Sequence, residues 1–137
     1  MHAVGNFDVK ITPVAPDDKS GDSAIGRMLI DKQFHGALDA TSKGEMLASM
    51  SGVKGSGGYV AMEHIQGTLQ DDQGKGRTGT FVLQHTGTMN RGEPSLSVTV
   101  VPDSGTSELT GLTGSMKMDI VDGKHFYEFD YALKEKH

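Results

Sequence analysis

Glu63 and His85 are the residues of this chain whose types and spacing best suit chemistry. They lie on two segments, 59–69 and 77–88, in which apolar and polar residues alternate. A hairpin with the odd-numbered residues on one face would place Glu63 directly or diagonally across from His85, about 5–8 Å apart at Cβ. In a pocket of low dielectric constant, such a carboxylate and imidazole can act as general acid and base, because burial and mutual charge shift their pKa values.

Plainer interpretations of the same residues stay open. The pair could be a satisfied polar contact that fixes the register of a sheet, or both side chains could face solvent. Glu45 is a further candidate for moving a proton, and a solvated turn position is its alternative. Serines 104 and 107 lie beside Gly105 without the GxSxG pattern of a nucleophile elbow, so they indicate a turn.

Metal and cofactor chemistry find little support in the sequence. Without cysteine, the chain can form neither a disulfide nor a cysteine-based zinc site. Four histidines would have to supply any metal site, and none has the short helical or loop spacing of known zinc motifs: His35, His64, His85 and His125. The Gly-Lys-Gly at 74–76 lacks the spacing of a phosphate loop. We therefore expect no metal and no cofactor.

Length and charge limit the possible partners. The 137 residues suit one domain, 1–137, and the net charge of −5 is spread over interspersed acidic and basic residues. This distribution argues against nucleic acid or an anionic membrane as the main partner. The first residues lack a basic stretch followed by an apolar core, and no later apolar run is long enough for a membrane helix. A cytoplasmic protein is the expectation.

Short alternating segments separated by glycine-rich turns predict strands. The first has its apolar residues at odd positions, and Lys32 interrupts the apolar face of the second. Residues 12–22 indicate a loop, 41–44 a turn, and 45–50 leave a short helix as the alternative to a strand. The predicted strands cover 4–11, 25–34, 45–51, 59–69, 77–88, 96–100, 116–120 and 127–131. About eight strands without crossover helices predict an all-β, antiparallel barrel, since closure removes edge strands.

Two sequence segments and several shorter motifs resemble a family of known fold. GTFVLQH at 79–85 and VVPDSGTSELTGLTG at 100–114 are similar to hallmarks of a family of small bacterial proteins of unknown function. Phe34-x-Gly36, Gly44-Glu45 and the Tyr-x-Phe-x-Tyr at 127–131 resemble its other recurrent positions. The resemblance implies an allene oxide cyclase-like, calycin-type or lipocalin-like barrel with a ligand cavity, and no activity. Val98 stands where family members often carry an aromatic residue, which would make the cavity roomier.

Inward-facing residues of such a barrel either fill it or enclose one small ligand. The candidates for pocket walls are Tyr59, Phe81, Leu83, Tyr127, Phe129 and Tyr131, and plain core packing is their alternative. Five methionines have the same two interpretations: Met28, Met46, Met62, Met116 and Met118. Outward Val60, Met62 and Val82 would form an apolar stripe of the kind found in homo-oligomers.

The sequence therefore supports three hypotheses. The first is binding of a small, largely apolar molecule inside the barrel, with Glu63, His85 and Glu45 as its polar contacts. The second is a cofactor-independent isomerase or cyclase-like enzyme, in which Glu63 or Glu45 moves a proton and His85 or a tyrosine polarises an oxygen. The third is a structural or interaction module that uses the exterior of the barrel.

Overall fold

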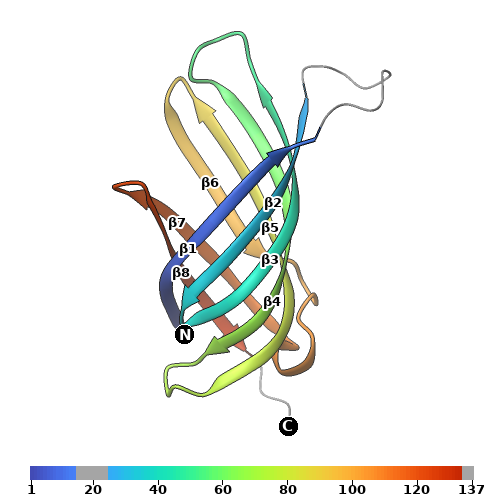
Figure 1. The fold of residues 1–137 in the computed structure, drawn as a ribbon, viewed down its shortest axis with the longest axis vertical. Coiled ribbons are helices and arrows are strands. Elements are labelled where there is room, and N and C mark those ends of the chain that lie inside the picture. The colour runs from blue at the N-terminus through green and yellow to red at the C-terminus, as the bar shows by residue number, and fades with distance from the viewer. Residues whose placement is uncertain (15–24, 134–137) are drawn as a thin grey trace.

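The computed structural model describes residues 1–14 and 25–133, which form one closed barrel of antiparallel strands (Figure 1). Each strand pairs with its neighbours in the sequence, and β1 also pairs with β8. The elements are β1 (His2–Pro13), β2 (Gly26–Gly36), β3 (Leu38–Met50), β4 (Gly57–Gln70), β5 (Gly76–Asn90), β6 (Glu93–Val100), the 3-10 helix η1 (Ser107–Leu109), β7 (Leu112–Val121) and β8 (Lys124–Leu133). The predicted all-β, eight-stranded barrel is confirmed.

Two predicted boundaries need correction. The turn expected at 41–44 is wrong, because these residues lie inside β3, which runs unbroken from Leu38 to Met50. The chain reverses earlier, at Gly36, whose φ of 105° is readily adopted only by glycine. Of the loop expected at 12–22, residues 15–22 lie outside the described part of the chain, whereas Thr12 and Pro13 belong to β1. The strand interpretation of 45–50 is confirmed over the helical one.

The two ends of the barrel differ in how they are filled. We call the end with the β2–β3 and β4–β5 turns the closed end, and the end with the β5–β6 and β7–β8 turns the open end. Alternation along each strand sends every second side chain inward. Toward the closed end these side chains form one apolar core, to which η1 adds Leu109. The core consists of Ala3, Phe7, Phe34, Leu38, Ala40, Ile65, Leu69, Phe81, Leu83, Val98, Val100, Leu109, Leu112, Met116, Tyr127, Phe129 and Tyr131.

The barrel wall is weakest between β6 and β7. A single residue pair, Thr99 with Ser115, joins these strands, whereas longer ladders join the other neighbours. In Figure 1, β7 diverges from β6 toward the open end. No helix in the described ranges 1–14 and 25–133 has the length and apolar character needed to cross a membrane.

Candidate functional site

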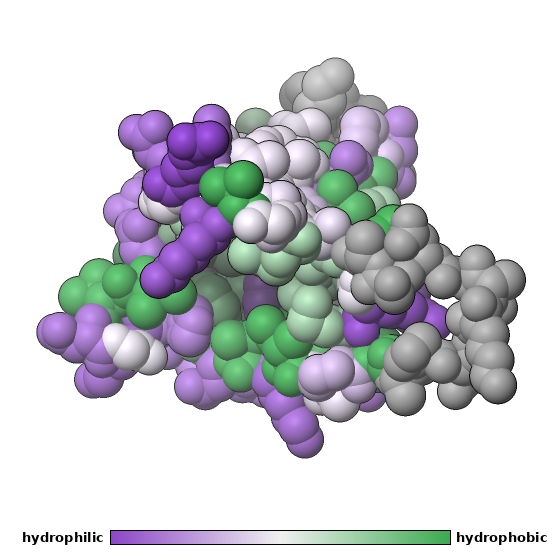
Figure 2. Space-filling view, turned by 90° about the horizontal axis from the view of Figure 1, so that it is seen from above, coloured by the Kyte–Doolittle hydropathy of each residue, from purple (hydrophilic) through white to green (hydrophobic). Residues whose placement is uncertain are grey.

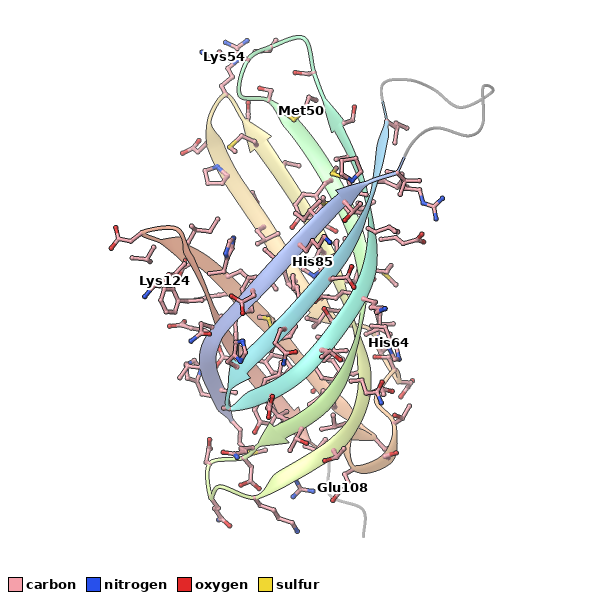
Figure 3. The ribbon with its side chains drawn as sticks, in the orientation of Figure 1. Met50, Lys54, His64, His85, Glu108 and Lys124 are labelled. Atoms are coloured by element: carbon pink, nitrogen blue, oxygen red, sulfur yellow. The ribbon has the colours of Figure 1, made fainter. Side chains whose placement is uncertain are left out.

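A buried polar pair lies inside the barrel where the filled part meets the open end. The β4–β5 ladder pairs Ala61 with His85 and Glu63 with Leu83, so Glu63 and His85 are diagonal neighbours. His85 Nε2 lies 2.8 Å from Glu63 Oε1, and both side chains are almost completely buried. Figure 3 shows His85 within the barrel and His64 outside it. The convergence predicted from the alternation of the two segments is confirmed.

Two further side chains complete the cluster. Lys32 on β2 places Nζ 3.1 Å from Glu63 Oε1, and the Ser42 hydroxyl on β3 donates a hydrogen bond to Glu63 Oε2. Lys32 Nζ also lies 4.9 Å from the centroid of the Phe7 ring and 5.7 Å from that of Phe34. Aromatic faces attract cations, so both rings help to hold the ammonium in place.

Sequence reasoning missed Lys32 and Ser42 as members of this cluster. A signal for Lys32 was present, since it interrupts the apolar face of its strand between Ile30 and Phe34. A charged residue at such a position points into the core and therefore requires a partner of opposite charge. For Ser42, the mistaken turn at 41–44 hid an inward-facing position of β3.

The cluster holds Glu63 as a carboxylate. Burial alone raises its pKa and is the largest single influence. The His85 hydrogen bond, the Lys32 charge and the Ser42 hydrogen bond act in the opposite direction and together hold the pKa of Glu63 below its usual 4.5. The charges of Lys32 and Glu63 compensate each other, so the floor of the open end carries polar atoms without a net charge from this ion pair.

Tyr59 lies next to the cluster on the side of the open end. Its ring centroid is 6.3 Å from that of His85, and the ring occupies space left by Gly87, where an added Cβ would clash with Tyr59 Cε1. Burial and then the negative charge of Glu63 raise the pKa of the Tyr59 hydroxyl, which therefore stays protonated. Among the described residues, this hydroxyl has no hydrogen-bond partner.

The other aromatic candidates for pocket walls belong to the closed core. Phe129 stacks on Phe81 at 5.9 Å and on Tyr131 at 5.2 Å between ring centroids. The Tyr127 hydroxyl accepts a hydrogen bond from the Leu38 amide and donates one to the His35 carbonyl. These residues, with Leu83, are buried and pack against one another. The structure therefore places Phe81, Leu83, Tyr127, Phe129 and Tyr131 in the packed core, whereas Tyr59 lies outside that core and is half-buried.

Glu45 does not belong to the site. It points outward from β3 and forms an exposed ion pair with Arg27. The alternation that sends Ser42 and Gly44 inward sends Glu45 outward, so the structure does not bring it together with Glu63 and His85. The remaining histidines are also dispersed: His35 bonds Asp8 on the exterior, and the His125 ring lies against Phe7. Within 1–14 and 25–133, no three acidic or histidine side chains are grouped as a metal site.

Above the cluster, the inward-facing side chains of the open end are apolar and exposed. Ile11, Met89, Leu96 and Ile120 share the inward alternation of buried neighbours, yet they are 49, 43, 44 and 69% exposed. Met28 and Met46, also inward-facing, are half-buried. Figure 2, which looks onto this end, shows hydrophobic residues around a central depression with hydrophilic surface deeper inside. The site is thus a hollow with apolar walls and a polar floor.

Comparisons with known proteins place this barrel in a family. The family model described as "Protein of unknown function (DUF3224)" matches residues 3–131, from the first strand to the last. The protein belongs to the DUF3224 family. A comparison with curated proteins finds no match.

A solved structure of a DUF3224 member is similar along the whole chain. The crystal structure of a protein of unknown function from this family, from Shewanella oneidensis MR-1, is 47% identical to the chain and covers 99% of it. The match covers 98% of the Shewanella chain, with a TM-score of 0.87. The resemblance to a family of unknown function is confirmed, and any assignment of activity within DUF3224 must come from the site itself.

Proposed function

We propose that the open end of the barrel binds a small, largely apolar molecule above the Glu63–His85 pair. The observation that carries the proposal is the change in exposure along the inward faces of the strands. Toward the closed end the inward side chains are buried against one another, whereas Leu96, Met89 and Ile11 face the hollow and are exposed. Small barrels either fill their interior or hold one ligand, and this barrel is filled at one end only.

Both the apolar walls and the polar floor of the hollow suit such a ligand. Covering exposed apolar walls stabilises a complex by roughly 25 cal/mol for each Å² removed from water. Two methionines of the wall, Met28 and Met46, have flexible side chains that adapt to varied ligand shapes. The polar atoms of His85 and Tyr59 at the floor supply the few oriented contacts typical of small-molecule sites.

A matched pair of methionine variants tests this proposal. Met46 on β3 faces the hollow, whereas Met62 on β4, paired opposite Glu45, lies half exposed on the exterior. The uncharged fluorescent probe N-phenyl-1-naphthylamine should bind the wild type saturably, and equally well after Met62→Arg. Met46→Arg should abolish binding because it introduces a charge into the hollow. Binding that Met46→Arg leaves intact would contradict the proposal, with circular dichroism confirming that both variants fold.

Proton-transfer catalysis is a second candidate, favoured by the hydrogen bond of 2.8 Å between His85 and Glu63. A carboxylate that orients an imidazole is a recurrent arrangement for a general base, and a protonated Tyr59 could polarise a substrate oxygen. Exchange of the α-protons of 2-tetralone with D₂O, followed by NMR, measures such activity without knowledge of the substrate. Faster exchange with the wild type than with His85→Gln is expected, and His64→Gln is the matched control. Equal rates for wild type and His85→Gln would exclude this candidate.

A further inference from the structure

Both oxygens of the Glu63 carboxylate are bonded to protein partners, and its complete burial prevents direct contact with a ligand. Oε1 accepts hydrogen bonds from His85 Nε2 at 2.8 Å and from Lys32 Nζ at 3.1 Å, and Oε2 accepts one from the Ser42 hydroxyl. The side chain of Glu63 is 0% exposed. Glu63 is therefore a positioning residue, which orients His85 through this hydrogen bond.

That contact determines which tautomer His85 adopts when its ring is neutral. Glu63 is a carboxylate, and a carboxylate can only accept hydrogen bonds. Nε2 must therefore carry the proton, which leaves Nδ1 with a lone pair. Lys32 already supplies the positive charge that Glu63 needs, so a second cation on His85 is not required to balance the cluster. Among the described residues, Nδ1 makes no hydrogen bond.

Nδ1 is the second ring nitrogen of His85, and no partner from the described residues bonds it. The buried side-chain nitrogen or oxygen that lacks a partner within 1–14 and 25–133 is Arg77 Nε, at the other end of β5. His85 Nδ1 thus has no partner among the described residues, in a ring that is almost wholly buried beside the hollow. The neighbouring Tyr59 hydroxyl is likewise unpaired among the described residues and stays protonated. The floor accordingly presents one acceptor, Nδ1, and one hydroxyl that can donate.

We infer that the molecule bound in the hollow is uncharged and carries a hydroxyl group, as an alcohol, phenol or enol does. The ligand hydroxyl donates to His85 Nδ1, and Tyr59 supplies a second hydrogen bond at the floor. A carboxylate would face a nitrogen lone pair instead of a donor, and the ammonium of Lys32 is already paired with Glu63. An ether of the same shape leaves Nδ1 desolvated and unpaired. This inference rests on the proposed binding function and names the ligand class.

Two measurements test the inference. The first needs no ligand: long-range ¹H–¹⁵N NMR at about pH 8 should show His85 protonated at Nε2 and unprotonated at Nδ1. A ring protonated at Nδ1, alone or together with Nε2, would overturn the inference. Because this measurement uses the wild type, it does not depend on whether a His85 variant folds.

The second measurement compares three probes of one shape by isothermal titration calorimetry: 2-naphthol, 2-methoxynaphthalene and 2-naphthoate. We expect 2-naphthol to bind about tenfold to a hundredfold more tightly than either of the others, since only it satisfies Nδ1. His85→Phe should remove this preference, and His64→Phe, on the exterior, should preserve it. Equal binding of 2-naphthol and 2-methoxynaphthalene would overturn the inference while leaving apolar binding intact. Failure of all three to bind would overturn both.

Discussion

Replacing Lys32 by methionine is expected to expose the energetic role of the buried cluster. Lys32 is 6% exposed, Glu63 is 0% exposed, and Nζ lies 3.1 Å from Oε1. Removing one partner of a buried ion pair typically costs about 3–5 kcal/mol, because the other charge remains in the interior uncompensated. Methionine keeps the apolar stem against Phe7 and Phe34, and Glu63 keeps its bonds from His85 and Ser42. We therefore expect a loss at the lower end, about 3 kcal/mol of the free energy of unfolding.

An exposed ion pair whose cation also lies on β2 provides the control. Arg27 on β2 and Glu45 on β3 contact each other with side chains 54 and 57% exposed. Exposed pairs contribute little, since water screens their charges and holding two long side chains in place costs entropy. Arg27→Met should therefore change stability far less than Lys32→Met, although both replace a cation on β2 by the same residue.

Urea unfolding followed by far-ultraviolet circular dichroism measures both effects. The double variant Lys32→Met with Glu63→Gln should lose less stability than the two single variants summed, with a coupling of roughly 1–3 kcal/mol. Two results would refute the reasoning. The first is a cost for Lys32→Met no larger than that of Arg27→Met. The second is exact additivity in the double variant, which would mean that the two side chains do not interact energetically.

Further variants test other parts of the structure. Because the folded-state pKa of Glu63 lies below 4.5, its stabilising effect is complete above that pH and is lost as pH falls through the folded pKa. When the pH is lowered from about 7 to about 3, the free energy of unfolding should therefore fall less for Glu63→Gln than for the wild type. Equal decreases for the two proteins, measured by urea unfolding at each pH, would contradict this prediction. The same variant should lower the raised pKa of Tyr59 toward 10.0, visible in an ultraviolet titration of tyrosinate; an unchanged value would mean that the carboxylate does not reach the hydroxyl. Phe129→Ala should cost about 3–5 kcal/mol in urea unfolding, since the ring is wholly buried, and a much smaller loss would mean a loosely packed closed end. Val60→Lys with Met62→Lys, at half-exposed exterior positions, should dissociate the predicted homo-oligomer in light-scattering measurements; a monomeric wild type would end that prediction.

Much of the site could be predicted from local pattern. The alternation of 59–69 and 77–88 predicts a hairpin, and the shared parity of Glu63 and His85 predicts their convergence, because side chains of a strand alternate with a period of two. Glu45 shows where this reasoning fails. Its parity within β3 is as visible as that of Glu63, but the mistaken turn at 41–44 separated it from Leu38 and Ala40, the inward-facing residues of the same strand that show it to face outward.

That Lys32 belongs to the cluster around Glu63 depended on how the strands pair. Lys32 reaches Glu63 from β2, 31 residues earlier in the chain, across the intervening strand β3. Local patterning marks Lys32 as unusual, but it cannot identify the partner, since the register between strands is set by turns and by packing over the whole barrel. The same holds for Tyr127, whose hydroxyl fastens the β2–β3 turn from the opposite end of the sequence.

The sequence by itself determined that this chain forms an antiparallel all-β barrel and that Glu63 and His85 share one face of a hairpin. Both depend on periodicity and turn chemistry, which act over a few residues. Only the tertiary structure decided that Phe81, Tyr127 and Phe129 fill the closed end while the opposite end stays hollow. Inward-facing residues occur at both ends, and whether they touch across the barrel depends on closure and on how residues from all eight strands pack together.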